Sequence, residues 1–196
     1  QSMGPKVIAI APGRQPQGIT DMLSTFTDSL KEKDVAELQK KNNVPHLAEI
    51  MPIVFGSQTA VYENEAYRPT ILGVTGLFTK IYNIYPSEGR IFTDEEVKGY
   101  ADVAIIGSKV KTQLFGNDGA LGQRIKIKGK NFRVIGIFPK TGQVSFLNFD
   151  DIVIIPYTTA QQYIFGIKYF NRVVVEADSE ENVNSTVNDI KITLRN

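Results

Sequence analysis

The stretch RIKIKGKNFRVIGIF, residues 124–138, constrains the fold more than any other, because charged and apolar side chains alternate at its start, over 124–128. Alternation with a period of two predicts a half-buried β-strand rather than a helix. One face would carry Arg124, Lys126 and Lys128, and the other Ile125 and Ile127. The chain would reverse near Gly129–Lys130, so the stretch predicts an antiparallel hairpin with a packed layer beneath its apolar face.

The whole chain has 196 residues, and outside this hairpin it divides into short strands and helices. Period-two or continuous apolar runs predict strands over 6–12, 47–55, 58–63, 67–74, 102–106, 151–157 and 171–177. Helical spacing predicts helices over 19–30, from Asp34 onward, 77–84, 108–115, 158–166 and 178–196. Strands and helices at both ends enclose a β-rich middle, so we expect an α+β fold with mostly antiparallel pairing and two lobes, the middle lobe being inserted into the outer one.

The segment IIGSKVKT has a glycine, a serine and a lysine after an apolar strand, so it is a candidate for a nucleotide-binding loop. A phosphate-binding loop needs the pattern G-x-x-x-x-G-K-[ST], and only Gly107, Ser108 and Lys109 are present. A strand that passes through glycine into a serine-capped helix is a common junction. The later segment GNDGALG precedes a strand, so it also fails the dinucleotide pattern. The sequence therefore favours a structural role for these glycines and no bound cofactor.

The residue inventory excludes several catalytic classes. The chain has no cysteine, which removes disulfides, thiolate catalysis and cysteine-ligated metals. His46 is the only histidine, and it follows Pro45, so we interpret it as a turn residue rather than a metal ligand or catalytic base. Acidic clusters fall at the starts of predicted elements, where carboxylates complement the helix dipole. These clusters are Asp94–Glu96, Asp150–Asp151 and Asp178 with Glu180 and Glu181. The sequence thus predicts no metal site and no enzyme.

A basic stripe runs along the predicted hairpin. It consists of Arg124, Lys126, Lys128, Lys130 and Arg133. Such a stripe could meet nucleic acid or could be the solvated face of a half-buried hairpin, where charge discourages edge-to-edge aggregation. The net charge of the chain is only +1, and no aromatic residues interleave with the basic ones, so we favour the solvated face and expect no nucleic-acid partner.

The segment 140–149 is the candidate partner-binding site. It reads as a loop but carries the large apolar residues Val144, Phe146, Leu147 and Phe149. These side chains could fold beneath the loop as a local cluster, or they could project as a contact for a partner protein. Composition does not decide between the two. We hypothesise that the loop projects and that these four residues bind a partner protein.

Several motifs occur in an order that resembles a known family. They are Gly89-Arg90-Ile91-Phe92, Val103–Gly107, Leu114–Gly122, Ile125–Gly136 and Asp150–Ala160. Each motif is degenerate, but in this order, over roughly 70–196, they closely resemble the extracytoplasmic core domain of MacB/FtsX-type ABC transporter permeases. The first third of the chain matches only in outline.

The resemblance implies a porter-like α/β subdomain formed by both chain ends and an inserted, β-rich Sabre-like subdomain. We place their boundaries at 1–86, 87–156 and 157–196. It also implies a non-catalytic domain, lying on the extracytoplasmic side of a bacterial membrane, that couples cytoplasmic ATP hydrolysis to export or other extracytoplasmic work. No apolar run in this sequence approaches the length that a helix needs to cross a bilayer. Both ends look cut, so we expect the full-length protein to be anchored in the membrane by segments outside this sequence.

The same resemblance implies the partners. These are the permease transmembrane core, a cytoplasmic ABC ATPase, a possible adaptor protein and a homo- or heterodimer mate. The alternative function is a stand-alone secreted binding module or hydrolase.

Overall fold

The computed structural model describes residues 5–11, 30–144 and 147–195, which form two compact units. The outer unit combines both chain ends, Met3–Ile53 and Lys168–Asn196, and the inserted unit is Val54–Ile167. Strand β3 (Leu47–Ser57) passes through the first junction and contributes to both units.

The outer unit is built on an antiparallel sheet in the order β1–β15–β3. Beside the first part of β3, its elements are β1 (Val7–Ile10), β2 (Leu30–Lys31), α1 (Glu32–Leu38), β14 (Tyr169–Phe170), β15 (Arg172–Ala177), the 3-10 turn η3 (Glu180–Asn182) and α6 (Val183–Arg195). All of β1 is buried, as an unbroken apolar run predicts. Helix α6 contacts β1 and α1 and buries Val183, Thr186 and Ile190 along one stripe.

The start of α1 differs from the expectation. The helix begins at Glu32 rather than at Asp34. Asp34 is the third helical residue, and its carboxylate accepts a hydrogen bond of 2.8 Å from the Lys31 backbone N–H. The predicted helix over 19–30 lies outside the described residues except for Leu30. Leu30 begins β2, where it pairs with Phe170.

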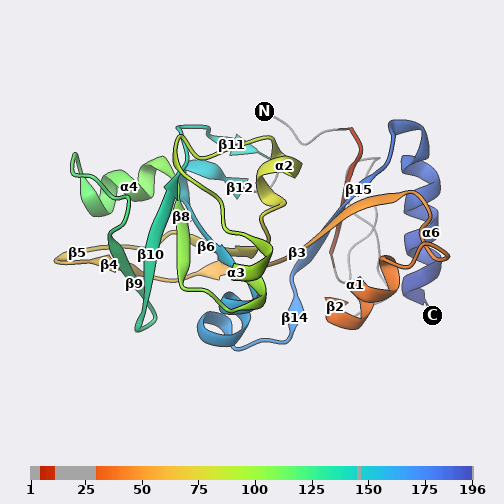
Figure 1. The fold of residues 1–196 in the computed structure, drawn as a ribbon, viewed down its shortest axis with the longest axis horizontal. Helices are drawn as coiled ribbons and strands as arrows, with labels where there is room; N and C mark the ends of the chain where they lie inside the picture. Colours follow the sequence, from red (N-terminus) through yellow and green to blue (C-terminus); the bar gives the residue numbers. More distant parts are fainter. Residues whose placement is uncertain (1–4, 12–29, 145–146, 196) are drawn as a thin grey trace. The chain divides into compact units, whose positions relative to one another are not determined.

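The inserted unit is organised around a mixed sheet in the order β3–β6–β13–β8–β10–β9–β4–β5, with β7 also pairing with β10 (Figure 1). Its strands are β4 (Ala60–Tyr62), β5 (Glu65–Tyr67), β6 (Thr70–Val74), β7 (Glu88–Gly89), β8 (Val103–Ile106), β9 (Arg124–Ile127), β10 (Lys130–Ile137), β11 (Gln143–Val144), β12 (Leu147–Asn148) and β13 (Ile152–Pro156). Its helical elements are α2 (Phe78–Tyr82), α3 (Asp94–Lys98), α4 (Ser108–Phe115), the 3-10 turn η1 (Phe149–Asp151), α5 (Tyr157–Thr159) and the π-helix η2 (Ala160–Phe165).

Strand β13 lies inside this sheet, parallel to β6 and antiparallel to β8. Every one of its residues is buried, which explains its unbroken apolar sequence. The predicted hairpin is confirmed: β9 pairs antiparallel with β10, with Ile125 and Ile127 buried. The α+β fold and the insertion of a β-rich unit into one made from both chain ends are as the sequence predicted.

The junctions between the units lie elsewhere than expected. The expected boundaries were 86/87 and 156/157, whereas the structure divides the chain at 53/54 and 167/168. Hydrogen bonding explains the difference, because β6 pairs with β13 and β4 pairs with β9, which ties residues 60–74 to the inserted unit. Helix α5 and the π-helix stay with this unit because the Gly73 backbone lies directly against Tyr157 and Ala160.

Candidate functional site

Gly107, which lies between β8 and α4, is fixed by close contact with backbone. Its N–H donates a 2.9 Å hydrogen bond to the Ile152 carbonyl. A Cβ at this position would lie 2.4 Å from the carbonyl oxygen of Phe149 and 2.6 Å from that of Asp150. Only glycine leaves room for these carbonyls. The described structure thus gives the Gly107-Ser108-Lys109 segment a packing role, consistent with the sequence analysis.

The motif Gly89-Arg90-Ile91-Phe92 also has a structural explanation. Gly89 has a φ of +76°, and a Cβ there would meet the Ile135 carbonyl oxygen at 2.0 Å, so this position requires glycine. The N–H of Arg90 then donates a 2.9 Å hydrogen bond to the same carbonyl. Phe92 is fully buried. The motif therefore holds the chain against β10 and anchors it in the core.

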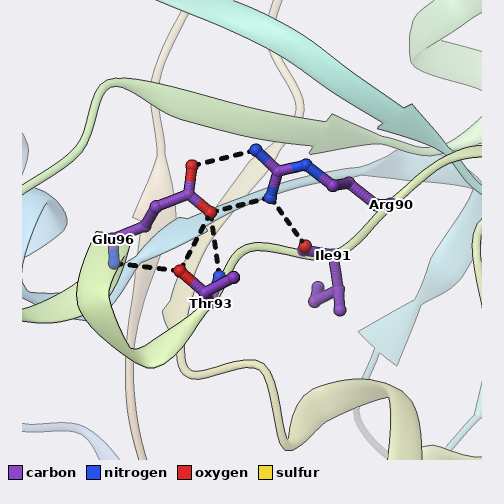
Figure 2. A network of polar contacts seen from close by, with 4 residues as sticks. All are labelled: Arg90, Ile91, Thr93 and Glu96. Carbon is purple, nitrogen blue, oxygen red and sulfur yellow. Dashed lines mark hydrogen bonds and ion pairs between the residues drawn. The ribbon is translucent and has the colours of Figure 1, made fainter.

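Arg90, Thr93 and Glu96 form the polar network shown in Figure 2. The Arg90 guanidinium donates two hydrogen bonds to the Glu96 carboxylate, at 2.7 and 3.1 Å. Thr93 caps α3: its hydroxyl accepts from the Glu96 N–H at 3.2 Å, while the Glu96 carboxylate accepts from the Thr93 N–H at 2.9 Å. The reciprocal bond and the ion pair were missed, although the spacing T-x-x-E signals such a capping box.

The surroundings of Glu96 lower the pKa of its carboxyl group. The Arg90 hydrogen bond is the largest cause, burial opposes it, and the hydrogen bonds from Thr93 add to it. The network is a surface clamp, since Arg90 is about half exposed. It fixes the entry into α3 and contains no group poised for catalysis.

The segment 140–149 is a short hairpin rather than a loop. Gln143 pairs with Asn148 and Val144 with Leu147, between strands β11 and β12. Val144, Leu147 and Phe149 are 2%, 3% and 0% exposed. The expectation that these three side chains project is therefore wrong, whereas Phe146 lies outside the described residues.

An aromatic cluster explains the burial of Phe149. Its ring centroid lies 5.4 Å from that of Phe78 and 5.3 Å from that of Tyr82, the latter edge to face. Phe138 joins the same cluster through Phe78 at 5.9 Å. Aromatic pairs at these separations add to the free energy of burial. Phe149 is thus a core residue, and the partner-binding hypothesis can hold only through other parts of the hairpin.

Asp150 closes the base of the hairpin. Its carboxylate accepts a hydrogen bond of 2.7 Å from the Thr141 N–H. Burial raises the pKa of Asp150, but hydrogen bonds from the Thr141 and Gly142 backbone and from Ser108 outweigh it and lower the pKa overall. The sequence analysis interpreted Asp150 only as a first-turn carboxylate. Nothing in its local sequence identified the partner, nine residues earlier in the chain.

His46 lies in the outer unit and is paired rather than poised for chemistry. Its Nδ1 lies 2.9 Å from an Asp178 carboxylate oxygen, and both side chains are nearly half exposed. The Asn182 side chain and then His46 lower the pKa of Asp178. The Asp178 N–H also donates to the His46 carbonyl at 2.8 Å. This contact joins the two chain ends at a turn, which is the role expected for His46.

Two grooves of the described structure have polar walls. One, of about 1040 Å³, is lined by α1 and the last turns of α6, and the other, of about 420 Å³, lies between the β4–β5 turn and the end of α4. Binding sites for small molecules are usually largely apolar with a few convergent polar groups. Among the described residues, no group of three or more His, Cys, Asp or Glu side chains could hold a metal ion. Neither groove presents a recognisable catalytic arrangement.

Comparison with known proteins places the chain in a family. The MacB-like periplasmic core domain family matches residues 1–192. The chain belongs to this family. It is 32% identical over 196 residues to the macrolide export ATP-binding/permease protein MacB of Chlorobaculum tepidum, covering all of this chain and 30% of that protein. The MacB protein of Neisseria gonorrhoeae is 29% identical over 187 residues, which cover 95% of this chain and 28% of that protein.

Solved structures show the same fold. The periplasmic region of MacB from Actinobacillus actinomycetemcomitans matches 98% of this chain and 84% of its own, with a TM-score of 0.80 and 18% identity. The extracellular domain of the noncanonic ABC-type transporter YknZ from Gram-positive bacteria covers 81% of this chain and 78% of its own, with a TM-score of 0.69 and 24% identity. The resemblance stated from the sequence motifs is confirmed. In the described part of the chain, no helix combines the length and apolar character needed to cross a bilayer.

Proposed function

We propose that this MacB-like core domain is the extracytoplasmic, non-catalytic part of an ABC transporter permease subunit. It would couple ATP hydrolysis in the cytoplasm to export or other work outside the membrane. The observation that carries the proposal is the family match over residues 1–192, with relatives named macrolide export ATP-binding/permease proteins. The chain spans less than a third of these relatives, so ATPase and transmembrane segments would lie in other parts of the protein.

The geometry supports a mechanical rather than a catalytic role. The motif glycines Gly89 and Gly107 are packed against backbone, which leaves no cradle for a phosphate at either position. Strand β3 continues without a break from the outer unit into the inserted unit. A continuous strand between two units is suited to transmitting displacement, because its covalent backbone is already nearly fully extended and has little length left to take up.

Its position on the outside of the membrane can be tested with one introduced cysteine. The chain has no cysteine, and an added Cβ at Gly119 meets nothing within 4 Å. In intact cells that express the full-length protein with Gly119→Cys, a membrane-impermeant maleimide should label this cysteine. The full-length protein without the substitution is the control. Labelling only after the cells are lysed would refute the extracytoplasmic location.

Transport itself can be tested in a host that lacks its own macrolide exporter. The full-length protein should raise the inhibitory concentration of a macrolide, and removal of this whole domain should abolish that effect while ATPase activity of the purified protein persists. Undiminished resistance after removal would refute the coupling role. Enzymatic activity of the isolated domain would instead favour the alternative, a secreted hydrolase.

The partners would be the transmembrane core, the ATPase, an adaptor and a dimer mate. We still propose that the β11–β12 hairpin contacts an extracytoplasmic partner. Val144, Leu147 and Phe149 would not make that contact, because their side chains are buried. Phe146→Ala in the full-length protein should then reduce partner binding without lowering the melting temperature. Unchanged binding would remove the hairpin from the proposal.

A further inference from the structure

On the outward side of the β9–β10 hairpin, three cations have no partner among the described residues: Arg124, Lys126 and Arg133, which we call the cationic face. All three are exposed. Their neighbours on the same side are Asn131 and, on β4, Val61, both directly opposite Lys126. None of the three forms an ion pair or side-chain hydrogen bond with any residue in the described part of the chain. By contrast, Lys130 on the other side pairs with Asp102 at 3.1 Å. Lys128, at the turn, instead donates a 3.0 Å hydrogen bond to the Ile164 carbonyl.

Arg124 and Arg133 face each other directly across the two strands. Side chains in this relation have Cβ atoms about 4.5–5.5 Å apart, and like charges so placed destabilise a sheet. Opposite charges at either position would help the hairpin instead. Solvation of the face requires only polar residues, so it does not account for two opposed arginines.

The cationic face is also uncovered. Helix α4 packs on the other side of the sheet, where the ring centroids of Phe115 and Tyr62 lie 4.2 Å apart. Successive side chains of a strand point to opposite sides, so Val61, which follows Ala60 and precedes Tyr62, shares the side of Lys126. Val61 is 36% exposed. Strands β4, β9 and β10 are neighbours in one sheet, and the three cations and Val61 lie exposed on one side of it.

We propose that the cationic face is a docking surface for an acidic surface of a partner protein. Two opposed guanidinium groups can hold one carboxylate, or two adjacent ones, through bidentate hydrogen bonds. Such contact would convert the repulsion between Arg124 and Arg133 into attraction, and Lys126 would extend it along β9. The flanking Val61 supplies a small apolar contact. The inference is independent of the transport proposal.

A protein partner fits this face better than a membrane. Electrostatic binding to anionic lipids typically uses clusters of about 4–8 Lys and Arg residues, and this face has three. Membrane-inserting surfaces also project large apolar or aromatic side chains. The apolar residue opposite Lys126 is Val61, whose side chain is small. A face with two opposed arginines and a small apolar neighbour matches the polar rim of a protein interface.

The test compares two triple variants of the 196-residue chain that lose the same charge. The patch variant is Arg124→Gln, Lys126→Gln and Arg133→Gln. The control variant is Lys33→Gln, Lys98→Gln and Lys168→Gln, which replaces three exposed lysines elsewhere. The probe is a fluorescein-labelled peptide of alternating Glu and Ser, with a Gln-Ser peptide for comparison. Fluorescence anisotropy is measured at low salt and at about 150 mM salt, where exposed charges beyond about 8 Å are screened.

The patch variant should lose at least about tenfold in affinity for the acidic peptide, and the control variant less than about threefold. Equal losses in the two variants would overturn the proposal, since they would reflect net charge alone. Vesicles of phosphatidylglycerol and phosphatidylcholine are the second probe. Patch-dependent binding to vesicles but not to the peptide would also overturn it, in favour of a membrane contact.

A second measurement tests the cost of the opposed arginines. Arg133→Gln removes the like-charge pair, so its melting temperature should equal or exceed that of the unmodified chain. A fall of several degrees would show that Arg133 stabilises the fold, and the retention of both arginines would then need no partner.

Discussion

Gly107→Ala tests whether the glycine in the Gly-Ser-Lys segment is required by packing. The Gly107 backbone has φ −76° and ψ 166°, which alanine adopts without strain. The whole cost is therefore steric. The new methyl group would lie 2.4 Å from the Phe149 carbonyl oxygen, 2.6 Å from the Asp150 carbonyl oxygen and 2.7 Å from the Asp150 carbonyl carbon.

These contacts set the expected magnitude. Overpacking a well-packed site costs about 1–3 kcal/mol of unfolding free energy, and here the obstructing atoms are backbone, which cannot rotate away. The alanine also restricts the unfolded chain, which stabilises by about 0.4–1 kcal/mol. We expect a net loss of roughly 1–2 kcal/mol, with the hydrogen bond from Gly107 to Ile152 lengthened as the segment moves.

The assay is urea unfolding followed by far-ultraviolet circular dichroism, since the chain has no tryptophan. Gly119→Ala is the matched control, because nothing lies within 4 Å of its added Cβ and its backbone is outside the left-handed region. It should be neutral or slightly stabilising. If the two variants have the same stability within about 0.5 kcal/mol, the close approach at Gly107 does not govern packing, and our explanation of the motif fails.

Leu147→Ala should cost about 2–5 kcal/mol of unfolding free energy in a denaturation curve, because this side chain is 3% exposed in the β11–β12 hairpin; a loss below 0.5 kcal/mol would contradict its burial. Glu96→Gln should cost about 1 kcal/mol at pH 7, from a weakened cap and a half-exposed ion pair. The folded state lowers the pKa of Glu96 below its ordinary value of 4.5, so this contribution is present above that pH and is lost as the pH falls through the folded pKa. The difference in stability between the two proteins should therefore close in acid, and a difference that widens would refute the assignment. Thermal melting with Mg-ATP or zinc should show no shift, whereas a ligand at 100 times its dissociation constant would add about 2.7 kcal/mol. Analytical ultracentrifugation should show a monomer or a weak dimer, and a stable dimer at low micromolar concentration would contradict this.

Local patterns in the sequence were sufficient to predict most individual strands and helices. The alternation over 124–128 predicted which face of the hairpin is buried, because successive side chains of a strand point to opposite faces. Helix α4 was predicted at its observed bounds, since glycine, an apolar i,i+4 pair and a terminal glycine delimit it. The apolar stripe of α6 was likewise local. The order of the motifs was sufficient to indicate the family from the sequence alone.

Only the tertiary structure decided which isolated apolar residues belong to the core. Val144, Leu147 and Phe149 show no sustained periodicity, so the sequence left their burial open. The aromatic rings that enclose Phe149 belong to α2, about 70 residues earlier in the chain. The same applies to the junctions between the units, which depend on β6 pairing with β13 and β4 with β9. It applies equally to Arg124 and Arg133, whose opposition depends on strand register. Periodicity reports what one segment can bury, whereas the identity of the partner is set by pairings between segments far apart in the chain.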